Sequence, residues 1–250
     1  MTIKIYNTAE LKIFSDRMGG IYGTEDWCMF MYSIMKMHKP KTIIELGTGC
    51  AVTSMWMAQA VKENEVGHIL TIDDGRDWQD VLQGNQPMFL PDEKKESFQD
   101  YFDLLTEKFE LKDQITLDMV AMPPFPQVDG TLDLLFSDFM HDPNSLIEIL
   151  SFYLPKMSAA SSIFMDSAST SFPSYCFLEL LTQHLNQGKI PLMLLNKVSD
   201  DDKKRVHELV SNSKFTLIHI CEAKDREQNS TAWLKIEPCD IRPYPRTRFH

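Results

Sequence analysis

Residues 42–53 decide the fold of this chain, and they read TIIELGTGCAVT. The first five are aliphatic or β-branched apart from one glutamate, and they predict a short buried strand. Gly47 and Gly49 predict a sharp turn after it, because glycine adopts left-handed backbone conformations without a Cβ clash. A helical pattern rich in Met, Trp and Ala follows from about Thr53 to Glu63. The stretch therefore predicts a strand, a glycine turn and a helix.

Strands and helices alternate outward from this stretch. Further strands are expected at about 68–73, 115–117, 132–136, 162–165, 215–221 and 231–236. Helices are expected at about 24–37, with Thr24 as N-cap, and at 93–109, 144–154, 174–186 and 200–211. This alternation predicts a single α/β domain with a mostly parallel seven-stranded sheet, helices on both faces and an antiparallel C-terminal hairpin.

The composition is typical of a soluble, globular protein. The 250 residues include 25 Lys and Arg against 36 Asp and Glu, for a net charge of −11. We expect a helical lid or substrate segment at 1–40, the main domain at 41–240 and an irregular tail at 241–250. An acidic chain without a basic stripe argues against a nucleic-acid partner and favours a small-molecule substrate.

The sequence also predicts where the protein is located and whether its cysteines form disulfides or bind zinc. Without a membrane-spanning stretch or a signal-type apolar core, we expect no membrane partner and a cytoplasmic protein. The five scattered cysteines include no C-x-x-C pair, which argues against a disulfide framework and a zinc site. Whether the chain forms a homodimer stays open.

A ligand site is expected at the glycine turn. In an open parallel sheet, ligands bind at the carboxyl ends of strands, and the helix after the turn directs N–H groups at the same space. Asp73, 26 residues after Gly47, ends the next strand, where a carboxylate accepts hydrogen bonds from a ribose diol. A dinucleotide site requires G-x-G-x-x-G, and Val52 at the third glycine position argues against NAD.

The segment Glu45-Leu46-Gly47-Thr48-Gly49 resembles the first motif of class I S-adenosylmethionine (SAM)-dependent methyltransferases, and Asp73 matches the acid of their second motif. The resemblance covers about 42–166 and implies a Rossmann-like methyltransferase domain. It is nearest to the small-molecule, catechol-type O-methyltransferase branch, since Thr53 and Ser54 match its helix-opening Ser/Thr. Ala51 departs from that pattern by replacing a frequent glycine.

The resemblance also implies a set of SAM contacts. They are Glu45, Gly47, Thr48, Gly49, Thr53, Asp73, Trp78, Asp118, Met119 and Asp138. Of these, Asp118, Met119 and Trp78 would lie beside the adenine. Met119 as a core residue and Trp78 as a loop anchor are the alternative interpretations.

Two acids follow the fourth and fifth strands, Asp138 and Asp166, and neighbouring parallel strands would bring them to one edge. Two such oxygen ligands suit Mg²⁺ or Ca²⁺. The catechol-type branch has an Asp-Asn pair after its fifth strand, but Ser167 replaces the Asn. We therefore favour transfer without a metal, with Asp138 and Asp166 as the alternative metal ligands.

His141 is the candidate catalytic base, acting with Asp138 in the same loop, because histidine can take a proton near neutral pH. The alternative is that His141 caps the helix after Asp142. The other six histidines have no comparable setting. The sequence thus predicts SAM-dependent methyl transfer to a small organic acceptor at oxygen. Transfer to nitrogen of a small molecule or peptide, or a non-catalytic nucleotide- or SAM-binding role, stays open.

Overall fold

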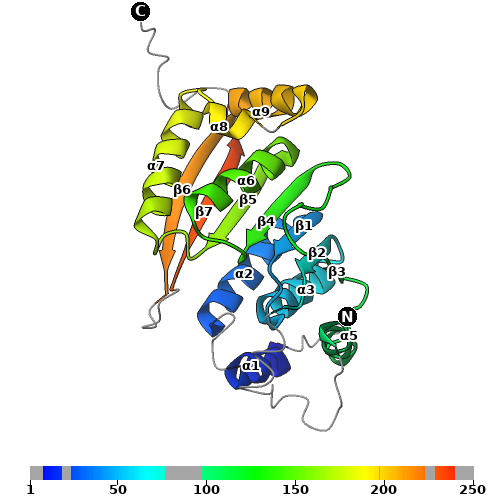
Figure 1. Cartoon of the computed structure of the whole chain (residues 1–250). Helices are drawn as coiled ribbons and strands as arrows, with labels where there is room; N and C mark the ends of the chain where they lie inside the picture. The colour runs from blue at the N-terminus through cyan, green and yellow to red at the C-terminus, as the bar shows by residue number, and fades with distance from the viewer. Residues whose placement is uncertain (1–7, 19–23, 77–96, 197, 223–228, 240–250) are drawn as a thin grey trace, which may run out of the picture. The chain divides into compact units, whose positions relative to one another are not determined.

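The computed structural model describes residues 8–18, 24–76, 97–196, 198–222 and 229–239 (Figure 1). Trp78 and the expected tail at 241–250 lie outside the described residues. The chain divides into two compact units, Met1–Pro123 and Pro124–His250, and each is described in turn.

The first unit contains three parallel strands. Its elements are α1 (Thr8–Arg17), α2 (Glu25–His38), β1 (Thr42–Leu46), α3 (Val52–Asn64), β2 (His68–Asp73), α5 (Phe98–Lys108) and β3 (Ile115–Met119). Their order is β3-β2-β1, with β1 paired to β2 and β2 to β3. The predicted strand, glycine turn and helix are confirmed as β1, the residues after it and α3.

Burial explains why α3 forms after the turn. Every residue from Val52 to Val61 is buried, so α3 is an interior helix. Its end is fixed to α2 by Glu63, whose side chain is 2% exposed and pairs with Lys36 at 3.1 Å. Tyr32 and Gln59 also donate hydrogen bonds to this carboxylate, at 2.5 and 2.9 Å. These contacts fix the helix that begins at the glycine turn.

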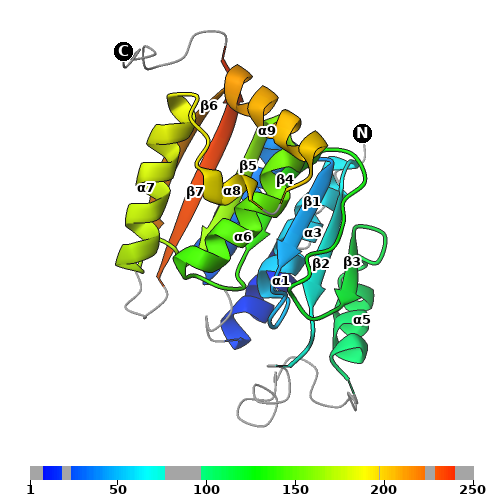
Figure 2. The same cartoon turned by 45° about the horizontal axis from the view of Figure 1, so that its top comes forward.

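The second unit continues the sheet pattern. Its elements are β4 (Leu132–Ser137), α6 (Pro143–Tyr153), the 3-10 turn η1 (Leu154–Lys156), β5 (Met157–Asp166), α7 (Phe172–Asn186), α8 (Leu192–Leu195), α9 (Asp200–Asn212), β6 (Ser213–Cys221) and β7 (Ser230–Pro238). The order is β4-β5-β7-β6, with β4 and β5 parallel and the β5–β7 and β7–β6 pairs antiparallel. Figure 2 shows α7 running along β6.

The described strands confirm the predicted α/β, Rossmann-like fold with seven strands and an antiparallel C-terminal hairpin. One strand boundary differs by more than two residues: β5 begins at Met157 rather than near 162. Ala159 and Ala160 in this extension are exposed, so side-chain burial does not mark it. Backbone pairing of Met157 with Leu132 and of Ser161 with Ile236 forms it instead. No helix among the described residues is long and apolar enough to span a membrane.

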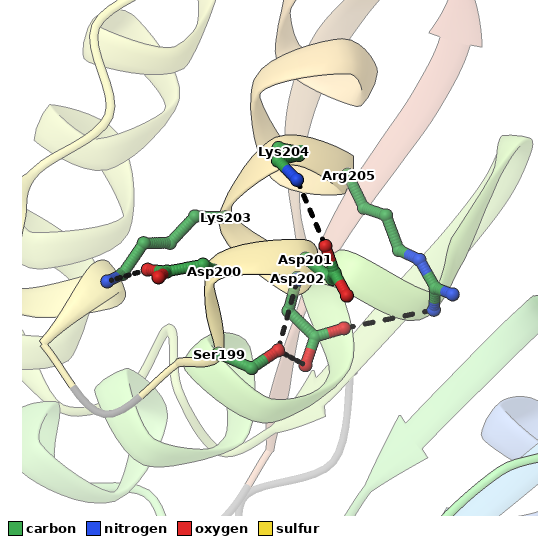
Figure 3. A network of polar contacts seen from close by, with 7 residues as sticks. All are labelled: Ser199, Asp200, Asp201, Asp202, Lys203, Lys204 and Arg205. Atoms are coloured by element: carbon green, nitrogen blue, oxygen red, sulfur yellow. Dashed lines mark hydrogen bonds and ion pairs between the residues drawn. The ribbon is translucent and has the colours of Figure 1, made fainter.

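The acidic start of α9 has a structural explanation (Figure 3). The Ser199 hydroxyl caps the helix by accepting from the Asp202 N–H at 3.1 Å. Asp200 and Asp201 pair with Lys203 and Lys204 one turn on, at 2.9 and 3.1 Å. Acids at the amino end and such exposed pairs stabilise a helix only weakly. This cluster therefore stabilises a surface helix.

Candidate functional site

The glycine turn has the backbone conformation that its sequence predicts. Gly47 and Gly49 have φ values of +87° and +53°, a region that favours glycine. Ala51 also has a positive φ, +61°, which costs a non-glycine residue about 1 to 2 kcal/mol. The departure from the family pattern at Ala51 therefore falls where the backbone favours glycine.

Asp73 is directly bonded to this turn. Its Oδ2 accepts hydrogen bonds from the backbone N–H groups of Thr48 and Gly49, at 2.9 and 3.1 Å. Its Oδ1 accepts from the Gly75 N–H at 2.8 Å. A carboxylate has about four acceptor positions, so about one remains for a hydroxyl donor. A second hydroxyl would have to share or replace a backbone donor.

An apolar wall lies beside Asp73. Met119 is aligned with Asp73 across β2 and β3 and is 41% exposed. Gly75 has a φ of +68°, and a Cβ there would come within 3.1 Å of Met119 Cε and of Phe98 Cβ. Met119 therefore lies next to the acid, at the end of the neighbouring strand. Gly75 and Phe98 were not predicted from the sequence, although a glycine two residues after a strand-ending Asp is a turn signal.

Two further predicted contacts lie on β3 and at the start of α3. Asp118 is half-buried and aligned with Ile72 on β2. Thr53 is 6% exposed in the first turn of α3.

Glu45 is buried behind the turn in a network of hydroxyl groups. It is 1% exposed, and its Oε2 accepts hydrogen bonds from Ser54 at 2.5 Å and Thr71 at 2.6 Å. The Thr71 hydroxyl also bonds to that of Thr48 in the turn, at 2.6 Å. Burial raises the pKa of Glu45 to about 7, against the opposing effect of the two hydroxyl bonds. Glu45 thus connects β1, α3 and the turn through hydrogen bonds.

This raised pKa makes the stability of the protein depend on pH. The folded chain holds the Glu45 proton up to about pH 7, whereas an unfolded chain releases it near 4.5. The protonated Glu45 therefore stabilises the folded state fully below pH 4.5. This stabilisation falls as pH rises to about 7, by up to about 1.4 kcal/mol per pH unit. Glutamine does not titrate, so Glu45→Gln should lack this pH dependence. The free energy of unfolding in urea should fall less between pH 5 and pH 7.5 in this variant than in wild type. Equal losses in both proteins would contradict the raised pKa.

In the second unit, Asp138 and Asp166 follow the paired ends of β4 and β5, where Ser137 is aligned with Met165. Both acids therefore lie at the same ends of two neighbouring parallel strands. Asp166 is 6% exposed, and its carboxylate accepts hydrogen bonds from Ser167 at 2.8 Å and Thr231 at 3.0 Å.

These contacts do not favour a metal at this edge. Ser167, which replaces the expected Asn ligand, donates its hydroxyl to Asp166 itself. Within the described part of the chain, no three His, Cys, Asp or Glu side chains are grouped so that they could hold a metal ion. The residues therefore fit the alternative of Asp138 and Asp166 as metal ligands poorly.

His141 is held in a defined orientation. Its Nδ1 lies 2.8 Å from the Asp166 carbonyl oxygen, and a carbonyl only accepts, so Nδ1 carries the hydrogen. In the neutral ring Nε2 then has the lone pair. The Ser174 hydroxyl fixes the same loop by donating to the His141 carbonyl.

The alternative role of His141 as a helix cap is wrong. The side chain of Asp142 caps α6, accepting from the N–H groups of Asn144 and Ser145 at 3.0 and 3.3 Å. An aspartate has the acceptor oxygen that an N-cap needs, and it directly precedes Pro143 at the first helical position. The imidazole of His141 is therefore not engaged in capping.

Comparisons with known proteins add to this geometry. Residues 44–168, which are 125 of the 250 residues, match a family model described as a methyltransferase domain. No curated protein matches the chain.

Solved structures share the fold at low sequence identity. The O-methyltransferase TomG from Streptomyces achromogenes, in complex with SAM, is 11% identical with a TM-score of 0.52, over 94% of this chain and 92% of that chain. An O-methyltransferase from Bacillus cereus, in complex with SAH, is 12% identical with a TM-score of 0.51, over 93% of both chains. SAH-bound PaMTH1, a methyltransferase from Podospora anserina, is 13% identical with a TM-score of 0.53, over 96% and 100%.

Proposed function

This chain belongs to the methyltransferase-domain family, and from that membership we propose that it transfers the methyl group of SAM to a small organic acceptor, at oxygen. One observation carries the proposal: the left-handed glycine turn whose Thr48 and Gly49 N–H groups meet Asp73. Solved proteins of this fold bind SAM or SAH, and two of them are O-methyltransferases.

The first-unit residues would hold the cofactor. The remaining acceptor position of Asp73 suits a ribose hydroxyl. Met119, with Gly75 and Phe98 behind it, offers an apolar surface for the adenine. Gly47 and Gly49 let the methionine part approach the backbone. Asp118, Thr53 and Glu45 remain predicted contacts, and Trp78 lies outside the described residues.

The second-unit residues would handle the acceptor. The lone pair on His141 Nε2 can take the hydroxyl proton while the acceptor oxygen bonds to the methyl carbon and the sulfur–methyl bond breaks. Asp138, half-buried at the end of β4, is also a predicted SAM contact, but in this proposal its main role is to orient the acceptor hydroxyl. Methyl transfer depends mainly on positioning, so these two residues are the catalytic candidates. In this proposal residues 1–40, which include α1 and α2, form the lid or substrate segment.

Calorimetry with SAH and NAD side by side tests the proposal. We expect SAH to bind one to one and NAD to give no binding signal, because the turn lacks the third glycine of a dinucleotide site. A preference for NAD would contradict the proposed cofactor. Labelled SAM with a panel of phenols, acids, amines, DNA and RNA would then identify the acceptor. Robust transfer to nucleic acid would contradict the small-molecule assignment, and transfer to nitrogen would contradict only the oxygen assignment.

Activity should survive EDTA. The reason is that Ser167 stands where the amide ligand is expected and instead donates its hydroxyl to Asp166. The measurement is turnover of the identified acceptor before and after chelation, with Mg²⁺ added back. Loss of turnover with EDTA, rescued by Mg²⁺ in wild type but not in Asp138→Asn or Asp166→Asn, would instead make the two acids metal ligands.

A further inference from the structure

A serine, a histidine and a glutamate form a hydrogen-bonded chain in the second unit, apart from His141. The Ser169 hydroxyl lies 2.6 Å from His219 Nδ1, and His219 Nε2 lies 3.1 Å from Glu179 Oε1. The residues next to His219 in the sequence do not indicate a setting comparable to that of His141. Its partners are 50 and 40 residues away, in the loop after β5 and in α7.

The hydrogen bonds of this chain set the direction in which a proton moves. A glutamate carboxylate only accepts, so Nε2 of His219 carries the hydrogen and donates it to Glu179. In the neutral ring Nδ1 then accepts from the Ser169 hydroxyl. A base held by an acid and bonded to a hydroxyl is the arrangement that activates a serine nucleophile.

The surroundings hold the three groups in place and leave them accessible. Tyr175 stacks on the His219 ring at a centroid distance of 4.3 Å. The side chain of His219 is 19% exposed and that of Glu179 is 40% exposed. Ser169 is half-buried. On the strand side, His219 is aligned with Ala232, which carries no charge. A small electrophile can therefore reach a serine whose base is fixed.

The loop that carries Ser169 is itself tied to β7. The N–H of Ser167 donates to the Ser230 carbonyl at 2.6 Å, and the Thr170 and Ser230 hydroxyls lie 2.5 Å apart. The 15-residue helix α7 begins at Phe172, and Ser171 provides no side-chain cap. The positive end of this helix dipole, three residues after Ser169, favours negative charge that develops on a nearby oxygen.

We propose that Ser169 is an activated nucleophile for small acyl esters, with His219 as its base and Glu179 orienting the base. The Ser169 oxygen bonds to the ester carbonyl carbon and the ester C–O bond breaks. The serine proton passes to His219 Nδ1 and from there to the leaving alkoxide. Water then cleaves the acyl-serine by the same route and releases the acid. This activity is independent of the proposed methyl transfer.

The test is reaction of the full-length protein with an alkyl fluorophosphonate, in which the serine oxygen displaces fluoride. Tandem mass spectrometry gives the labelling rate of each serine. Ser158 is an internal reference, because it is also half-buried but donates only to the Ala160 carbonyl, at 3.3 Å. We expect Ser169 to label about 100-fold faster than Ser158, the usual size of general-base activation.

Variants assign the effect to the three residues. His219→Gln should bring Ser169 down to the Ser158 rate, and Glu179→Gln should slow it about tenfold. His184→Gln, which removes an exposed imidazole from the last turn of α7, is the matched control and should label like wild type. Circular dichroism and SAH binding check that the variants fold. Equal labelling rates for Ser169 and Ser158 in wild type would contradict the proposal, and so would an unchanged Ser169 rate in a folded His219→Gln. The three residues would then only stabilise the packing of the loop, α7 and β6.

Discussion

Asp73→Ala should weaken SAH binding by about 1.5 to 3 kcal/mol, or about ten- to 150-fold in Kd, the range for hydrogen bonds to a charged group. We expect the upper part of this range because Asp73 has two roles. It offers an acceptor to the ribose, and it holds the N–H groups of Thr48 and Gly49 in the turn. Calorimetry with SAH gives the Kd and the stoichiometry.

The neighbouring acid supplies the matched control. Asp74 is also partly exposed, but its carboxylate bonds to the backbone and guanidinium of Arg76 and not to the turn. Asp74→Ala removes the same charge one residue away and should change the Kd little. Asp73→Asn, which keeps one acceptor oxygen, should fall between the two. If Asp73→Ala and Asp74→Ala bind SAH like wild type, the cofactor site lies elsewhere.

The sequence predicts the site best where the chemistry is local. Gly47 and Gly49 permit the left-handed backbone that the turn needs. Thr24 is the predicted N-cap, and its side chain accepts the Trp27 N–H at 3.2 Å. The order of strands predicts that Asp73 ends β2 beside the glycine turn. These features depend on residues close in the sequence or on the alternation of strands and helices. The spacing of apolar residues along the chain predicts that alternation.

Contacts between distant side chains could not be predicted. The carboxylate of Asp166 accepts a hydrogen bond from Thr231, 65 residues later. Ser169 and His219 are 50 residues apart. The sequence also leaves open whether His141 caps α6. The placement of the side chains answers this, because the cap is Asp142.

His141→Ala should lower turnover by about 100-fold or more, because general-base catalysis contributes at least about that factor. The structure strengthens this expectation. Nδ1 is fixed on the Asp166 carbonyl, which leaves the lone pair on Nε2, and Asp142 takes the capping role that would have made His141 structural. The measurement is the initial rate with the acceptor found in the screen, at saturating SAM, together with the SAH Kd. The Kd should stay near wild type, since His141 handles the acceptor.

A second histidine variant serves as the control. It shows whether the rate falls because the base is lost or because any imidazole is removed. His207 is exposed on α9, and His207→Ala should keep the wild-type rate. Asp138→Asn should alter the KM for the acceptor with little change in SAH affinity, because Asp138 faces the acceptor in this proposal. If His141→Ala turns over at the wild-type rate while SAH still binds, the acceptor proton leaves without His141. Methyl transfer would then rest on positioning alone, with the cofactor assignment unaffected.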